Sequence, residues 1–182
     1  MRTSFVKEML IEVEADVAHA AILARLGDDT AGRIRAETPV AWVDAADFEA
    51  LVAAVVDAAG DDALHRISRR HFLRFRDSPF MKATIDAMVR IFGLTPHTVL
   101  KNLPRGRGSL VKDGGFATYD KVDDTSCRLT LREFHPSRWA VALVNLTGTW
   151  HGVFDICHVQ GTITVEREDA VAGNVDFIVR WR

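Results

Sequence analysis

Over roughly the first 110 residues, apolar residues recur every three or four positions, the period of an α-helix with one buried face. Glycines, prolines and paired aspartates interrupt this pattern where helices normally begin or end. The pattern predicts one helix capped by Thr3 or Ser4 and ended by Gly27, a short helix over 29–36, a helix capped by Asp44 or Asp47 and closed by Gly60, and further helices over 61–77, 79–92 and 96–103. We therefore expect an N-terminal helical layer.

The period changes to two after Gly114. Alternating apolar and polar residues predict strands over 116–122, 127–134, 162–168 and 174–181, with a long helix over 138–158 between the second and third strands. Such alternation is typical of an antiparallel sheet with one solvent-exposed face. The face covered by helices is expected to hold Cys127, Leu129, Leu131, Val175, Phe177 and Val179, and the wetter face Arg128, Arg132 and Arg180.

Together these patterns predict an α+β fold, in which an N-terminal helical layer packs on a C-terminal ββαββ four-stranded antiparallel sheet unit. A sheet this small needs a helical partner to bury its apolar face. We therefore expect one domain over 1–182, mainly helical over 1–113 and ββαββ over 114–182.

The 182 residues carry 23 basic and 25 acidic side chains, which gives a formal net charge of −2. This balance creates no field that attracts nucleic acid or a membrane surface, so neither is expected as a partner. No apolar run approaches the ~18 residues that span a bilayer, and acidic residues interrupt the N-terminal segment where a signal peptide is apolar. We expect a cytoplasmic protein in which Cys127 and Cys157 are reduced.

His151, Asp155 and His158 lie at positions i, i+4 and i+7 of the helix expected over 138–158, so their side chains would project from one face. Neutral imidazoles and a carboxylate at this spacing could offer three ligands to zinc or iron. The same residues would also suit an exposed helix edge without a metal, because histidine is favoured near a helix C-terminus. The sequence leaves both interpretations open.

Two arginine-containing segments could bind anions. Arg66, Arg70 and Arg74 form a ridge along the helix over 61–77, which could hold a phosphate, a nucleic-acid backbone or an acidic partner, or could pair with nearby acids such as the aspartates at 57, 61 and 62. The run over 103–109 combines glycines with arginines, which suggests either an anion-binding nest or a turn before the sheet.

Several residues of the C-terminal half resemble a known family. They are Tyr119, Cys127, Pro136, the helix segment Gly148-Thr149-Trp150 with Gly152, and the terminal Val179-Arg180-Trp181. The N-terminal stretch over 2–6 and the aromatic residues Trp42 and Phe48 fit as well, so the resemblance covers nearly the whole chain. The pattern looks like an uncharacterised family, abundant in myxobacteria, that has no assigned activity.

The same order of elements is similar to haem-nitric-oxide-binding domains and to 4-vinyl-reductase-like ligand-binding domains of bacterial regulators. This similarity implies a helical subdomain packed on an αββαββ half, with a ligand held between them. The haem-binding relatives use a proximal histidine on the helix before the first strand and a Tyr-x-Ser-x-Arg run that holds the haem propionates. Here the segment 99–111 contains no histidine and Phe134-His135-Pro136-Ser137-Arg138 does not reproduce the run, so haem is not expected as a cofactor.

No complete catalytic motif is present, and we expect no catalytic residue. The leading hypothesis is a non-catalytic cytoplasmic module that senses a small ligand or binds a protein partner, with a homodimer as one arrangement. Leu143, Trp150 and Phe154 are expected to line the ligand pocket. The alternatives are a metal-dependent enzyme that uses His151, Asp155 and His158, and a scaffold subunit without a ligand.

Overall fold

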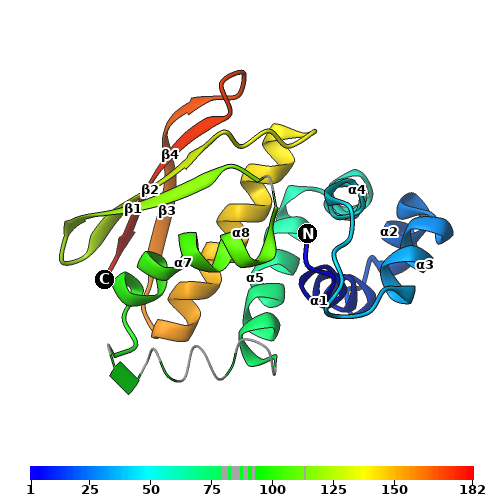
Figure 1. Cartoon of the computed structure of the whole chain (residues 1–182), viewed down its shortest axis with the longest axis horizontal. Helices are drawn as coiled ribbons and strands as arrows, with labels where there is room; N and C mark the ends of the chain where they lie inside the picture. The colour runs from blue at the N-terminus through cyan, green and yellow to red at the C-terminus, as the bar shows by residue number, and fades with distance from the viewer. Residues whose placement is uncertain (79–81, 83–86, 88–89, 92, 113) are drawn as a thin grey trace. The chain divides into compact units, whose positions relative to one another are not determined.

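Helices make up the N-terminal part and a sheet with one long helix makes up the C-terminal part of the computed structural model (Figure 1). It describes the chain except for residues 79–81, 83–86, 88–89, 92 and 113 and the side chains of 105–107 and 109. The elements are α1 (Thr3–Glu14), α2 (His19–Leu26), α3 (Asp28–Ala36), α4 (Ala45–Ala59), α5 (Asp61–Asp77), α7 (Pro96–Leu110), β1 (Phe116–Asp123), β2 (Ser126–Arg132), α8 (Trp139–Cys157), β3 (Gly161–Asp169) and β4 (Asn174–Trp181). The predicted α+β fold with its four-stranded antiparallel sheet is confirmed.

The chain divides into two compact units. The first unit comprises Met1–Phe75 and Pro136–Thr149, and the second comprises Arg76–His135 and Trp150–Arg182. These units differ from the expected division at 113/114, since α7 belongs with the sheet and the first half of α8 belongs with the N-terminal helices. α8 thus contributes to both units.

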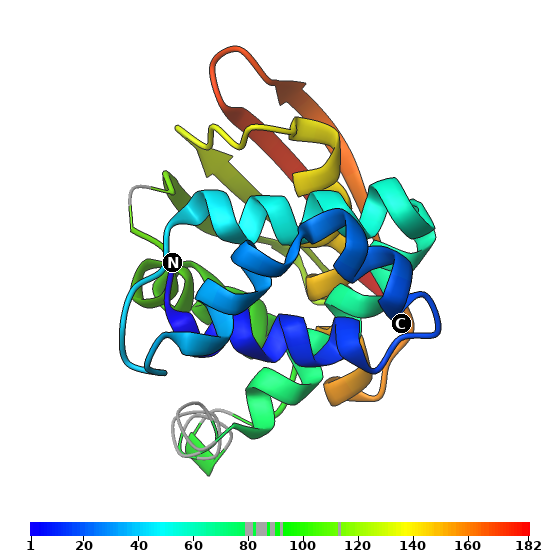
Figure 2. The same ribbon diagram turned by 90° about the vertical axis from the view of Figure 1, so that its right-hand side faces the viewer.

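The helices of the first unit enclose an apolar core, and Figure 2 shows the N-terminal helices, coloured blue to cyan, gathered beside one another. α2 packs mainly against α4, and α1 contacts α2, α3 and α4. The fully buried core side chains include Val6, Met9, Val13, Ile22, Ile34 and Leu51. Val6, Met9, Val13 and Leu51 are apolar positions of the predicted helical period. The same period, continued past residue 16, places Ala20, Ala21 and Ala24 inward, but these are exposed and Ile22 is buried instead, so the pattern identifies this core only in part.

The helix expected to run to Gly27 is interrupted between α1 and α2. The carboxylate of Asp16 accepts a hydrogen bond from the backbone N–H of Ala18 (3.1 Å), and the carbonyl oxygen of Asp16 accepts one from the N–H of His19 (3.0 Å). An aspartate that satisfies nearby backbone groups in this way competes with the helix. Val17, which the helical period counts as apolar and inward, is therefore 96% exposed at this turn.

The ends of the other N-terminal helices test the predicted caps. Asp44 caps α4 as predicted, because its carboxylate accepts a hydrogen bond from the N–H of Ala46 (2.9 Å), and Gly60 ends the helix with a φ of 82°. The cap of α1 is not the predicted one. Arg2 holds the N-cap position, where its side chain makes no capping hydrogen bond, and Thr3 lies buried as the first residue of the helix.

The sheet of the second unit has the strand order β1-β2-β4-β3. The six apolar residues predicted for the covered face are each at most 3% exposed; they are Cys127, Leu129, Leu131, Val175, Phe177 and Val179. Arg128 and Arg132 are half-buried and Arg180 is exposed. The predicted register is therefore confirmed.

The second half of α8 supplies large side chains that pack on the sheet. Trp150 is 7% exposed and its ring meets that of Phe177 edge to face, with 4.8 Å between the ring centroids. Phe154 is also buried and lies so close to Gly161 that a Cβ added there would collide with its ring. This contact explains the glycine at the start of β3.

The remaining expectations concern the run over 103–109, the helix over 79–92, the two cysteines and membrane-spanning segments. α7 extends to Leu110, so the run over 103–109 is helical, with Pro104 inside the helix, and is neither a nest nor a turn. The helix expected over 79–92 falls largely outside the described residues. Cys127 and Cys157 are free thiols, as expected. In the part of the chain that the structure describes, no helix is both long and apolar enough to cross a membrane.

Candidate functional site

A histidine in the first turn of α7 is the centre of the candidate site. The helix begins with Pro96, and the hydroxyl of Thr95 accepts a hydrogen bond from the N–H of Thr98 (3.2 Å). A capping hydroxyl followed by proline in the first helical position is a common helix start, because proline has no N–H to leave unpaired. This start places His97 inside α7.

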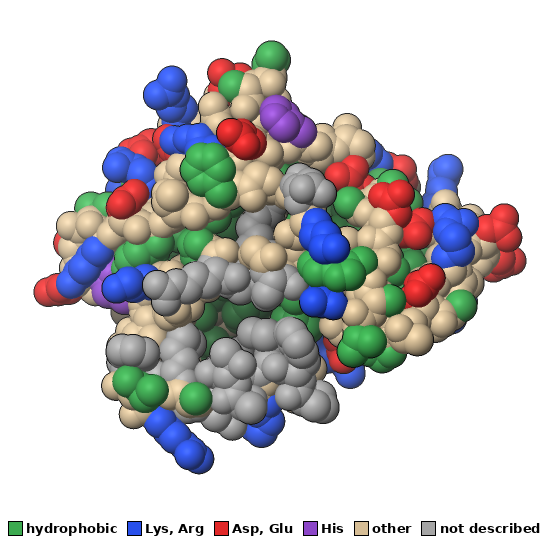
Figure 3. Space-filling model, in the orientation of Figure 1, with side chains coloured by type: hydrophobic (Ala, Val, Ile, Leu, Met, Phe, Trp, Pro, Cys, Tyr) green, Lys and Arg blue, Asp and Glu red, His purple; other side chains and the backbone are tan. Residues whose placement is uncertain are grey.

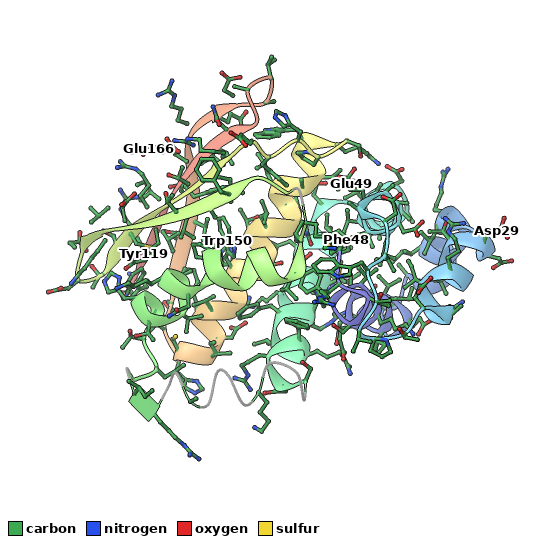
Figure 4. The ribbon with its side chains drawn as sticks, in the orientation of Figure 1. Asp29, Phe48, Glu49, Tyr119, Trp150 and Glu166 are labelled. Atoms are coloured by element: carbon green, nitrogen blue, oxygen red, sulfur yellow. The ribbon has the colours of Figure 1, made fainter. Side chains whose placement is uncertain are left out.

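The His97 ring is held by two aromatic residues of the sheet. Its Nδ1 lies 2.5 Å from the hydroxyl of Tyr119 on β1, and its ring meets that of Trp181 on β4 at a centroid distance of 4.6 Å and an interplanar angle of 80°. Figure 4 shows Tyr119 at the end of the sheet near the first turn of α7. The resemblance drawn from the sequence already includes Tyr119 and Trp181, although without a role for either.

The other ring nitrogen of His97 is unpaired. Nε2 is buried and has no hydrogen-bond partner among the residues that the structure describes. A histidine that binds a metal through one nitrogen usually has its other nitrogen hydrogen-bonded, which fixes the ring. His97 has this arrangement, with Nδ1 fixed by Tyr119 and Nε2 available.

Tyr119 keeps its proton in this setting. Burial, with a smaller contribution from Cys127, raises the pKa of the Tyr119 phenol from its ordinary value of 10 to about 12. The hydroxyl is therefore neutral at physiological pH and can either donate or accept a hydrogen bond. It can stay bonded to Nδ1 whichever nitrogen of His97 carries the proton.

His71 on α5 is a second buried imidazole, in the first unit. Its Nε2 lies 2.9 Å from the carbonyl oxygen of Phe5, while its Nδ1 is buried without a hydrogen-bond partner in the described chain. The rings of Phe5 and Phe75 lie against it, at centroid distances of 4.3 and 6.3 Å. Burial lowers the pKa of His71 from 6.5 to about 4, so the ring is neutral at physiological pH.

The arginine ridge of α5 pairs with acids of the first unit, but not with the expected aspartates. Arg70 donates to the carboxylates of Glu12 (2.9 Å) and Asp16 (3.1 Å), and Arg74 donates to Glu12 (2.5 Å). Arg66 lies 3.4 Å from Asp16. The acids come from α1 and the turn after it, so the ridge is engaged within the fold. Figure 3 likewise shows basic and acidic side chains interspersed on the face it presents.

Asp16 is buried, with 3% of its side chain exposed. Burial alone would raise the pKa of Asp16, but the hydrogen bond from the Ala18 N–H and the guanidinium groups of Arg70 and Arg66 lower the pKa below its ordinary value. The carboxylate is thus charged at neutral pH. This charge is balanced by the ridge, so the ridge is not an open anion-binding surface.

His151, Asp155 and His158, the metal ligands predicted from the sequence, lie at and just beyond the end of α8. In the described part of the chain, no group of three or more His, Cys, Asp or Glu side chains is placed to hold a metal ion. His151 lies edge to face on Phe154 at 5.5 Å, and His158 lies beyond the end of α8 with a φ of 54°. The helical spacing on which the prediction relied therefore does not reach His158.

The three expected pocket residues are placed differently from one another. Leu143 is half-buried in the half of α8 that belongs to the first unit, whereas Trp150 and Phe154 are buried in the second unit, with Trp150 lying between α8 and the sheet (Figure 4). An apolar pocket lined by these residues stays a prediction.

A polar groove lies on the outer face of the sheet, with a volume of about 680 Å³. It is lined by Thr118, Asp120, Arg128, Thr130, Arg132, Glu166, Arg167 and Asp176. Arg128 pairs with Glu166 (3.0 Å) and Arg132 with Asp176 (2.7 Å), so most of its charges are balanced within the sheet.

No protein-family model matches this sequence, and a search of curated proteins finds no match either. Solved structures do share the fold. An Fe(II) unliganded H-NOX protein from K. algicida superposes with a TM-score of 0.70 at 15% sequence identity. The superposition covers 100% of this chain and 97% of the K. algicida chain. An oxygen-binding H-NOX domain related to soluble guanylate cyclases, in its oxygen complex, gives a TM-score of 0.71 at 11% identity, with 100% and 95% covered.

A third H-NOX structure, from work on haem distortion in that family, gives a TM-score of 0.69 at 11% identity and covers 100% of this chain and 94% of its own. The fold resemblance to haem-nitric-oxide-binding domains is thus confirmed. The expectation that haem is not the cofactor is contradicted, because the matching structures are those of haem-binding domains. That expectation relied on the absence of a histidine from the helix before the first strand. This helix begins at Pro96 and does contain a histidine, His97.

Proposed function

We propose that this chain is a non-catalytic, small-ligand-sensing module of the H-NOX type, which binds haem with His97 Nε2 as the axial ligand. The observation that carries the proposal is the buried, unpaired Nε2 on the helix before β1. The fold similarity to haem-binding domains supports it. The bound state would be reported to a protein partner by a change in conformation.

The donor at this site fits an iron porphyrin. Imidazole nitrogen is the proximal ligand in many haem proteins, and it needs a lone pair that no hydrogen bond occupies. His97 Nε2 meets this requirement, while Tyr119 and Trp181 orient the ring. When bound, haem supplies an iron with an exchangeable coordination position for a small diatomic ligand.

The propionate groups would be bound differently from those of the resembling domains. The run Phe134-His135-Pro136-Ser137-Arg138 replaces Tyr-x-Ser-x-Arg, and Arg138 forms an ion pair with Asp57 (2.8 Å). Both partners are about half exposed, so this pair is weak and exchangeable. In this proposal His97 supplies the axial donor, while the carboxylate-binding run differs from that of the resembling domains.

Reconstitution of the purified chain with haem tests the proposal. We expect the wild type to take up one haem per chain, as measured by iron and porphyrin analysis together with the Soret band. His97→Ala should lose this uptake, and added imidazole should restore part of it by replacing the missing ligand. His158→Gln, which changes an exposed histidine of the second unit beyond the end of α8, should bind haem like the wild type. Failure of the wild type to bind, or equal uptake by His97→Ala, would overturn the proposal and favour a ligand-free scaffold.

A further inference from the structure

Tyr119 contacts His97, the candidate metal-binding residue, from the covered face of the sheet. Its Cα pairs with that of Leu129 in the β1–β2 register, and alternation along β1 puts Thr118 on the opposite face. Leu129 is 3% exposed. The phenol is therefore anchored on a paired strand with a packed neighbour, and its hydroxyl reaches Nδ1 of His97 at 2.5 Å.

The hydrogen bond at Nδ1 decides what Nε2 can do. A neutral imidazole has one N–H, and the nitrogen without it carries the free lone pair. If Nδ1–H donates to the phenol oxygen, Nε2 presents its lone pair and can bind a cation. If the phenol donates to Nδ1 instead, Nε2 carries the proton and cannot act as a ligand.

The surroundings of Nε2 favour the first arrangement. Nε2 is buried with no acceptor within hydrogen-bond distance in the described residues, so a proton placed there would be an unsatisfied donor. A proton on Nδ1 has a partner in the Tyr119 oxygen. The edge-to-face contact with Trp181 further limits rotation of the ring.

We propose that Tyr119 is a positioning residue that fixes the orientation and tautomer of His97, so that Nε2 is presented as a ligand. The part of the proposal that concerns iron rests on the proposed function. By accepting a hydrogen bond from Nδ1–H, Tyr119 makes His97 a stronger electron donor, as hydrogen-bonded partners of metal-binding histidines generally do. This raises the affinity for haem and stabilises the oxidised iron relative to the reduced iron.

The tautomer can be tested without haem. In ¹⁵N NMR of the haem-free protein above the pKa of free histidine, we expect His97 to give one neutral tautomer with the proton on Nδ1. In Tyr119→Phe, which removes only the hydroxyl, the ring should lose this preference and show averaged shifts. Thr118→Val removes a hydroxyl from the neighbouring position on the opposite face of β1 and should leave the His97 signals unchanged. An Nε2-protonated ring in the wild type, or identical signals in Tyr119→Phe, would overturn the proposal.

The haem-loaded protein gives a second measurement. Loss of an outer hydrogen bond to a metal-binding histidine typically weakens binding by about 10- to 100-fold, so Tyr119→Phe should release haem at least about tenfold faster. Its iron–histidine stretching frequency should fall and its reduction potential should rise, two changes that a merely loosened fold would not produce together. Unchanged values in a stably folded Tyr119→Phe would overturn the role of Tyr119. A wild type that binds no haem would instead overturn the proposed function, and the tautomer measurement would still decide the positioning.

Discussion

His71 and His97 each have one buried ring nitrogen without a hydrogen-bond partner in the described chain, but their surroundings differ. His97 is half-buried between two aromatic residues of the sheet, and its bonded nitrogen meets a hydroxyl that can accept or donate. His71 is fully buried among phenylalanines, and its bonded nitrogen meets a backbone carbonyl, which can only accept. The Phe5 carbonyl therefore keeps the His71 proton on Nε2.

The burial of His71 should make stability depend on pH. Its pKa is lowered from the ordinary 6.5 to about 4 in the folded chain. Between these two pH values the unfolded chain therefore binds more protons than the folded chain. Stability should therefore be fully present above about pH 6.5 and fall as the pH is lowered toward 4, by up to about 3 kcal/mol. Urea unfolding at a series of pH values measures this slope.

The matched variants for this measurement are His71→Phe and His19→Ala. His71→Phe should flatten the pH dependence between 6.5 and 4, because the titrating group is gone. His19 is exposed on α2, so His19→Ala should keep the wild-type slope. An unchanged slope in His71→Phe would show that other groups cause the pH dependence.

At the scale of elements, the arginine ridge joins α5 to α1. Glu12 and Asp16 are buried, with 7% and 3% of their side chains exposed, and Arg70 donates to both. Glu12 also pairs with Arg74 of the ridge. Buried carboxylates need such donors, because an uncompensated charge in the interior is costly.

Arg70→Met should therefore destabilise the chain by about 2 kcal/mol, the usual cost of removing a hydrogen bond to a charged buried group. Arg66 and Arg74 remain as donors, which keeps the loss below that of a fully unpaired buried charge. Arg35 and Glu14 form the matched exposed pair, with 51% and 39% of their side chains exposed. Arg35→Met should cost less than about 1 kcal/mol. Urea unfolding measures both variants, and an equal loss of unfolding free energy in Arg70→Met and Arg35→Met would contradict this interpretation of the ridge.

The sequence predicts what depends on local spacing and misses what depends on distant contacts. The strand alternation predicts the register of the sheet, since a slip by one residue would expose every apolar side chain. The spacing of Arg66, Arg70 and Arg74 predicts a ridge. Its acidic partners lie 50 or more residues away in the sequence, so the expected pairing with nearby aspartates is wrong. The break at Asp16 is local in origin, because this aspartate accepts hydrogen bonds from the N–H groups of Ala18 and His19, and the helical period alone does not reveal it.

His97 illustrates the same limit within the candidate site. The Thr95-Pro96 pair was a usable signal for the helix start, and it places His97 in α7. A helix counted only from residue 99 excludes this histidine, which is why the sequence pattern predicts no axial ligand. Its contacts with Tyr119 and Trp181 join residues separated by 22 positions or more, which no local pattern reveals.

At the scale of the whole molecule, α8 links the two units. Its residues up to Thr149 belong to the first unit and its residues from Trp150 belong to the second. The first half packs closely on α5 at Gly148, where an added Cβ would lie 2.5 Å from the carbonyl oxygen of His65. The second half packs on the sheet through Trp150. Unfolding of either unit thus removes the packing of one half of a continuous helix.

This shared helix should make the two units unfold together. In native-state hydrogen exchange, we expect the slowest amides of α4 in the first unit and of β2 and β4 in the second to report the same free energy of opening, equal to that of global unfolding. Thr149→Pro, placed where α8 passes from one unit to the other, should cost about 3 kcal/mol or more and separate the two values, because proline removes a helical hydrogen bond and clashes with the preceding turn. A wild type whose two units already differ in opening free energy would show that α8 does not couple them. Equal values in wild type and different values in the proline variant would identify α8 as the element through which an event in one unit affects the stability of the other.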